Sequence, residues 1–117
     1  MLLNQDLYHE LLRLSAALET AVADLRRAGQ RAADTENRYR FAKATAYLAS
    51  SGTVAERTAH VDKACSTEQL TAHLAEAEQV ACLEAIRSLR AQMSALQSVA
   101  AASRAEAELT THHNHTT

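Results

Sequence analysis

Apolar and small residues recur along the first part of the chain in alternating steps of four and three. The positions are Leu7, Leu11, Leu14, Leu18, Ala21, Leu25, Ala28, Ala32, Thr35, Tyr39, Ala42 and Ala46. A seam with this spacing is typical of a helix that packs lengthwise against another helix. We therefore expect one helix over about 6–49. A kink or short break near Gly29 is the alternative, since glycine in a helix costs about 1 kcal/mol relative to alanine.

The run SSGT, residues 50–53, carries signals for the end of one helix and the start of another. Gly52 suits the left-handed backbone that ends many helices. Thr53 followed by Glu56 has the spacing of a capping box, which begins a helix. The sequence therefore predicts that the chain reverses at 50–53.

A second seam follows the turn. It is interrupted by Glu68 and Gln79 and consists of Val54, Thr58, Val61, Cys65, Ala72, Ala75, Cys82, Ile86, Leu89, Met93, Leu96 and Ala100. This spacing predicts a second helix over about 54–103. The two helices together predict an all-α fold, a long antiparallel helical hairpin.

Another apolar line lies on a different face of the second helix, at Leu70, Leu74, Ala77, Ala81 and Leu83. One partner helix cannot cover both faces, and a hairpin alone has little interior. We therefore expect residues 1–103 to form a homo-oligomeric helical bundle or ring. The residues expected to hold copies together are Leu70, Leu74, Ile86, Leu89, Met93 and Leu96.

Composition restricts the class of protein. The 117 residues give room for one domain, and only Phe41 and three tyrosines are aromatic. No apolar run reaches membrane length and no signal peptide is evident, so we expect a cytoplasmic protein without a membrane partner. Cys65 and Cys82 are expected to be small core residues, with no metal or disulfide. Residues 104–117, whose His112, His113 and His115 offer at most weak metal binding, are expected to be a frayed or disordered tail.

Charge is distributed unevenly. The formal net charge is -2, but residues 26–43 hold six basic and two acidic side chains, about +4. A basic helical face with aromatic residues nearby is typical of proteins that bind single-stranded nucleic acid. The residues expected to bind DNA are Arg27, Arg31, Arg38, Arg40 and Lys43, with Tyr47 as a stacking partner. The alternative is a solvated face whose arginines pair with acidic residues of a neighbouring copy.

No catalytic constellation is evident. Ser50 and Ser51 are explained by helix capping, and His60 and His73 have no carboxylate in a fixed triad arrangement. Two isolated glycines cannot form a phosphate-binding loop. We therefore expect no enzymatic activity and no cofactor.

Two longer segments carry a family resemblance: RYRFAKATAYLASSGTVAERTAHVD and EAIRSLRAQMSALQSVAAASRAEA. They resemble small helical proteins encoded by phages of actinobacteria, and their layout is similar to that of the UvsY recombination mediators. The resemblance covers roughly residues 18–105. The matching positions are Lys43, Ala44, Ala46 and Tyr47 before the turn, Gly52 within it, and Ala85, Ile86 and Arg87 in the closing helix.

This resemblance implies a ring-like oligomer in the host cytoplasm that binds single-stranded DNA. It also implies that the protein displaces single-strand-binding protein and helps to load a recombinase. The alternative function is a non-enzymatic helical adaptor or structural protein that binds a host or phage protein.

Overall fold

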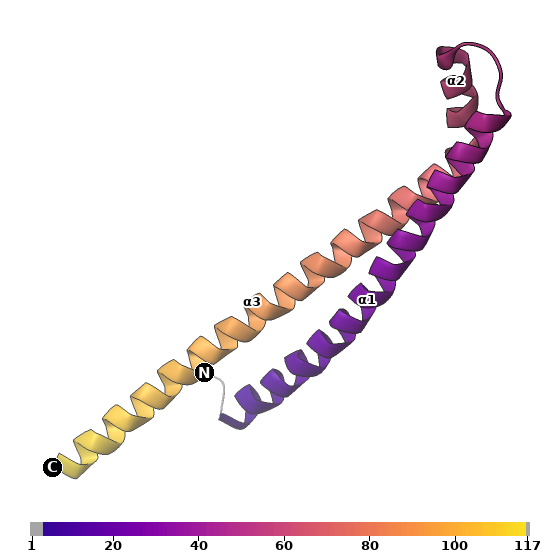
Figure 1. The fold of residues 1–117 in the computed structure, drawn as a ribbon. Helices are drawn as coiled ribbons and strands as arrows, with labels where there is room; N and C mark the ends of the chain where they lie inside the picture. Colours follow the sequence, from indigo (N-terminus) through magenta and orange to yellow (C-terminus); the bar gives the residue numbers. More distant parts are fainter. Residues whose placement is uncertain (1–3, 117) are drawn as a thin grey trace. The chain divides into compact units, whose positions relative to one another are not determined.

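The computed structural model describes the backbone of residues 4–116 and the side chains of residues 4–112. This part of the chain forms three helices and no strand (Figure 1): α1, Asn4–Ala49; α2, Val54–Ala64; and α3, Ser66–Thr116. The expected all-α fold class is thereby confirmed. Association between copies stays a prediction.

The predicted turn lies between α1 and α2. Gly52 has φ +105°, a backbone region that side chains with a Cβ rarely adopt. Thr53 caps α2, since its Oγ1 accepts a hydrogen bond from the Glu56 N–H at 3.2 Å. At the other end, Ser50 Oγ donates to the Ala46 carbonyl at 2.6 Å. Helix α1 is continuous through Gly29.

The expected single helix over 54–103 is instead two helices that meet at Cys65. Its φ and ψ are -105° and 14°, although its N–H still donates to the Val61 carbonyl at 2.9 Å. The adjacent Ser66 hydroxyl donates to the Lys63 carbonyl, a side-chain bond that competes with regular helix. The break therefore spans one residue.

The expected frayed tail also differs from the structure, because α3 continues to Thr116. Residues 101–108 are mainly alanine and glutamate, which are strong helix formers even without packing partners. All side chains from 104 to 112 are exposed. The side chains of His113 and His115, and all of Thr117, lie outside the described residues.

The chain divides into two compact units. Unit 1 comprises the described residues of Met1–Val22 and Glu84–Thr117, and unit 2 is Ala23–Leu83. Within unit 1, the start of α1 packs antiparallel against α3. The seam of unit 1 is rich in large side chains: Leu7, Leu14, Ala21 and Ile86 are buried, and Leu11, Leu18, Leu89, Met93 and Leu96 are half-buried.

Unit 2 has a seam of small side chains. Its buried residues are Ala28, Thr35, Val61, Cys65, Ala72 and Ala75. Thr35 is a polar member, and its Oγ1 donates to the Arg31 carbonyl at 2.8 Å, so its burial leaves no unpaired hydroxyl. Gly29 faces Gln79, whose Nε2 would lie 3.4 Å from a Cβ built on the glycine. Small residues on α1 and α3, among them Ala32, Ala33 and Ala72, leave room for this polar side chain.

Candidate functional site

The structure distributes the predicted DNA-binding residues over two edges of α1 in unit 2. Arg27 and Arg31 line a groove with Glu78 and Cys82 of α3. Arg38 follows Arg31 by seven residues, so helical geometry places it on the same edge. We call these three residues the arginine edge.

The other predicted cations lie elsewhere. Arg40 lines a separate groove with Gly29 of α1 and Gln79 of α3. Arg40 also lines a third groove, together with Lys43 and Tyr47. Counting 100° per residue from the seam puts Arg31 and Lys43 on opposite sides of it. The six residues therefore do not form one continuous basic face.

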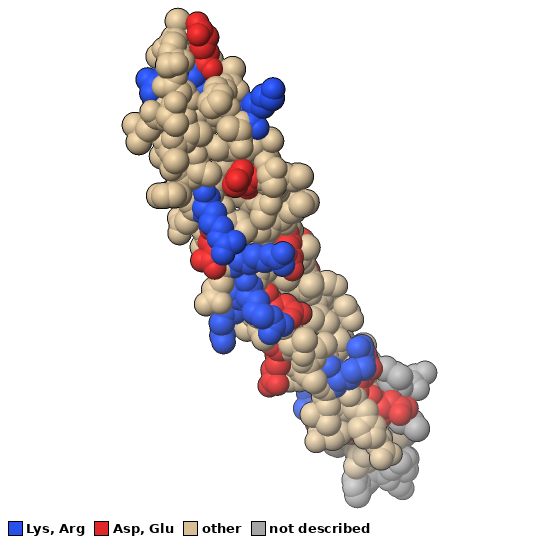
Figure 2. Space-filling view, turned by 90° about the vertical axis from the view of Figure 1, so that its right-hand side faces the viewer, with Lys and Arg blue, Asp and Glu red and all other residues tan. Residues whose placement is uncertain are grey.

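Most of these arginines have acidic partners within the chain. Arg27 pairs with Asp24, Arg31 Nη1 lies 3.6 Å from Glu78 Oε2, and Arg40 Nε lies 3.0 Å from Glu36 Oε1. Figure 2 shows Lys and Arg side chains gathered in one area with Asp and Glu side chains directly beside them. All the paired side chains are exposed, so each pair contributes little to stability. The pairs nevertheless reduce the positive potential available to a phosphate.

Arg57 is a residue that the sequence reasoning missed. Its guanidinium carbon lies 4.1 Å from the centroid of the Tyr47 ring, and its Nη2 donates to the Tyr47 carbonyl oxygen at 2.8 Å. One face of the ring expected to stack on a base is therefore covered. The sequence feature that could have indicated this contact is the short turn at 50–53, because a short turn places α2 against the end of α1.

Because the turn places α2 beside the end of α1, a groove of about 640 Å³ lies between the two helices, which we call the α1–α2 groove. Apolar contributions come from Ala44, Leu48 and the buried Val61, while two cations and one acid lie among the other lining residues. The full lining is Arg40, Lys43, Ala44, Tyr47, Leu48, Thr58, Val61 and Asp62. Because Arg40 pairs with Glu36, Lys43 and Asp62 are the charged lining residues that form no ion pair with another described residue.

The residues expected to hold copies together separate into two groups. Ile86, Leu89, Met93 and Leu96 belong to the seam within unit 1, where all four are buried or half-buried. By contrast, Leu70 and Leu74 in unit 2 are 59% and 62% exposed. Of the six residues, only these last two remain available to a partner in large part.

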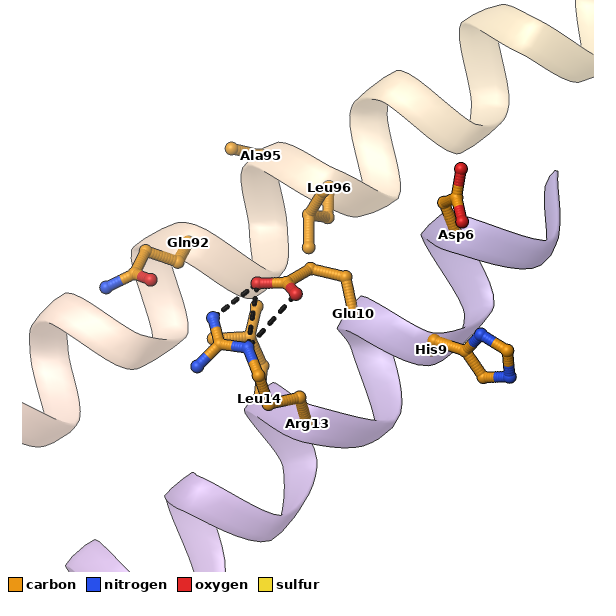
Figure 3. Close-up of a pocket in the computed structure, with 8 residues that line it drawn as sticks. All are labelled: Asp6, His9, Glu10, Arg13, Leu14, Gln92, Ala95 and Leu96. Atoms are coloured by element: carbon orange, nitrogen blue, oxygen red, sulfur yellow. Dashed lines mark hydrogen bonds and ion pairs between the residues drawn. The ribbon is translucent and has the colours of Figure 1, made fainter. Parts of the chain in front are cut away.

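Unit 1 has a groove of about 670 Å³ (Figure 3). The Glu10 carboxylate and the Arg13 guanidinium pair within it, close to Leu96 of α3, while His9 points away from α3. The hydrogen bond from Arg13 lowers the pKa of Glu10 below its ordinary value. Both side chains are exposed, and this arrangement stabilises the helix surface without providing a reactive group.

In the described part of the chain, His, Cys, Asp and Glu side chains form no group of three or more that could hold a metal ion. Across residues 4–116, no helix is long and apolar enough to cross a membrane. Cys65 is buried, Cys82 is half-buried, and both are free thiols. No protein-family model matches this sequence, and no curated protein or solved structure matches it significantly.

Proposed function

We propose that this protein is a non-enzymatic helical adaptor that acts through protein–protein contacts of unit 2, including contacts between its own copies. One observation carries the proposal: unit 2 exposes large apolar side chains on all three of its helices. They are Phe41 at 76%, Leu48 at 81%, Val54 at 70%, Leu70 at 59% and Leu74 at 62%. Phe41 with Leu48 and Leu70 with Leu74 recur at helical spacing, and rows of exposed apolar side chains of this kind mark interaction sites.

The charged side chains support the same reading. Arg27, Arg31 and Arg40 already have carboxylate partners within the chain. A protein partner can use the apolar surface while leaving these pairs at a solvated rim. A nucleic acid would instead have to compete with the carboxylates for the arginines.

The experiment is sedimentation velocity over a wide concentration range, with a double variant, Leu70→Gln/Leu74→Gln. We expect the parent to associate and the variant to shift toward monomer with unchanged helicity. The control is Val99→Gln/Leu109→Gln, which changes side chains in unit 1 that are 45% and 70% exposed. A parent that stays monomeric at every concentration, or a variant that associates like the parent, contradicts the proposal.

Single-stranded DNA binding, in the manner of a recombination mediator that cooperates with a recombinase and a single-strand-binding protein, is the second candidate. Half of the twelve basic residues lie within 26–43. Arg38 is exposed and forms no ion pair with another described residue. These two observations favour a local binding site for phosphate despite the net charge of -2.

Fluorescence anisotropy with a labelled oligonucleotide separates the two candidates. If the arginine edge binds DNA, affinity falls with salt, with a slope of about 0.7 per neutralised phosphate. Arg31→Glu/Arg38→Glu should then abolish binding, while Arg87→Glu/Arg90→Glu, an equal charge change in unit 1, should not. Absence of binding at about 50 mM salt excludes this second function, because counterion competition is already weak there.

A further inference from the structure

The side of α3 that faces away from α1 in unit 2 carries an apolar row, which we call the α3 row. It consists of four exposed residues at steps of four, three and four: Leu70, Leu74, Ala77 and Ala81. Counting 100° per residue places the row on the side of α3 opposite the buried Ala72 and Ala75. Steps of this kind are the pattern by which one helix packs lengthwise on another.

The chain exposes more surface than a folded monomer of its mass needs. Its mass is 12.7 kDa and its accessible surface is 8765 Å², whereas a compact monomer of this mass exposes about 6200 Å². Part of the difference lies in residues 104–112, whose side chains are all exposed. The whole difference, about 2500 Å², exceeds the roughly 1600 Å² that a standard protein interface buries. Enough surface is therefore available for a second copy.

The α3 row is complementary to itself when two copies of α3 pack antiparallel. In one register Leu70 of each copy faces Ala81 of the other, and Leu74 of each copy faces Ala77 of the other. Every large side chain then lies against a small one, which fills the space between two helices without cavities or overlap. A two-fold axis repeats both pairs, so the contact has four layers.

Neighbouring registers fit less well. A shift of one heptad in one direction places Leu70 against Leu74 of the other copy and moves Ala81 out of the contact. The opposite shift places Leu74 against the carboxylate of Glu84. Parallel helices place leucine against leucine and alanine against alanine, which leaves gaps at the alanine layers. The order of large and small residues therefore favours the one antiparallel register.

The charged side chains of unit 2 are compatible with this contact. Unit 2 carries eight acidic and eight basic side chains, so two copies have no net charge to repel each other. Glu78 lies beside the α3 row and faces Thr71 of the other copy in the favoured register. It keeps Arg31 of its own chain as its partner, at 3.6 Å. The contact therefore forms without exchanging an ion pair.

We propose that the α3 rows of two copies pack against each other, antiparallel and about a two-fold axis. The inference rests on the proposed self-association and specifies the surface that carries it. Because both copies use the same surface, association through this contact closes at two copies. The row is about 17 Å long, a small contact, so the dimer is weak and reversible. The α1–α2 groove and the arginine edge lie outside the contact.

Exchanging large and small side chains tests the register by sedimentation equilibrium. Leu70→Ala leaves two cavities in the dimer, and Ala81→Leu forces two pairs of leucines together. Each should weaken self-association by at least about tenfold. An equimolar mixture of the two variants should recover the parental affinity, because every leucine of the mixed dimer again faces an alanine. The double variant Leu70→Ala/Ala81→Leu should associate like the parent for the same reason.

A mixture of Leu70→Ala with Ala77→Leu is the matched control. Residues 70 and 77 do not face each other in the favoured register, so this mixed dimer keeps one cavity and one overlap and should not recover. Alanine and leucine are both strong helix formers, and all the changed positions are exposed. The variants should therefore keep the helicity of the parent, which circular dichroism checks.

The outcomes separate the two proposals. Weaker association of both single variants, with recovery in the first mixture alone, supports the α3 contact. Association that neither single variant weakens, or that does not recover in the first mixture, overturns the α3 contact and leaves the adaptor proposal standing. Equal recovery in the control mixture also overturns this register. A parent that never associates overturns both proposals.

Discussion

The guanidinium of Arg57 stacks on the Tyr47 ring at 4.1 Å and also donates to the carbonyl oxygen of the same residue at 2.8 Å. This double contact joins α2 to the end of α1 across the turn. Replacing Tyr47 by leucine removes the ring but keeps the carbonyl acceptor. We therefore expect Tyr47→Leu to reduce the free energy of unfolding by about 0.5–2 kcal/mol, the range for a cation over an aromatic ring.

Denaturant unfolding of Tyr47→Leu, Arg57→Met and the double variant measures this coupling. Arg57→Met should cost more than Tyr47→Leu, because it also removes the hydrogen bond, worth about 1 kcal/mol. The double variant should cost less than the sum of the two single ones. Strict additivity would show that the stacked geometry contributes nothing.

The two glycines should respond in opposite directions to alanine. Gly52 has φ +105°, and an added Cβ would lie 2.5 Å from Glu56 Oε2. We expect Gly52→Ala to destabilise the protein by about 1–3 kcal/mol through backbone strain. Thermal unfolding followed by circular dichroism measures the change.

Gly29→Ala provides the matched comparison. Gly29 lies in the middle of α1, and its added Cβ would meet Gln79 Nε2 at 3.4 Å, an ordinary contact distance. Alanine should therefore stabilise the protein by up to about 1 kcal/mol through helix propensity. A destabilised Gly29→Ala would mean that α1 and α3 approach more closely here than the structure indicates.

Leu14 is the largest fully buried side chain among the described residues, with 1% of its surface exposed. Leu14→Ala should cost about 2–5 kcal/mol, since it removes buried methyl groups and leaves a cavity in unit 1. Leu12→Ala, two residues away and 51% exposed, should change stability by no more than about 0.5 kcal/mol. Chemical denaturation of both variants at equal protein concentration tests this contrast.

Acid should weaken the Glu10–Arg13 pair. The hydrogen bond from Arg13 lowers the pKa of Glu10 below its ordinary value of 4.5. Because the folded-state pKa is the lower one, the pair stabilises the fold above pH 4.5 and loses that effect as the pH falls through the folded value. Carboxyl chemical shifts measured during an NMR titration should show the lowered pKa of Glu10, and Arg13→Gln should return it toward the ordinary value.

Much of the fold was predictable because helical packing leaves a regular pattern. All twelve positions of the first predicted seam, from Leu7 to Ala46, are buried or half-buried. The turn was predictable because Gly52 and Thr53 each satisfy a local backbone requirement. The break at Cys65 was not, since the spacing from Val61 to Cys65 to Glu68 keeps the four-and-three step and therefore resembles unbroken helix.

The candidate site was less predictable for a geometric reason. Arg31 and Lys43 lie about equally far from the seam, but on opposite sides of it. The angle between a residue and the seam therefore shows that a cation is exposed. It does not show on which side of the seam the cation lies, and so does not show which cations share an edge. The contact between Arg57 and Tyr47 depends on where α2 packs after the turn, and no local periodicity contains that information.

The change from large to small side chains along the seam also bears on how the helices open. Each buried CH₂ group contributes about 0.8 kcal/mol, so an alanine seam resists separation less than a leucine seam. Residues 72–82 of α3 lie in the alanine seam of unit 2, and residues 86–96 lie in the leucine seam of unit 1. Backbone amides of the first segment should therefore exchange with deuterated solvent sooner than those of the second, and unit 2 should open while unit 1 stays closed.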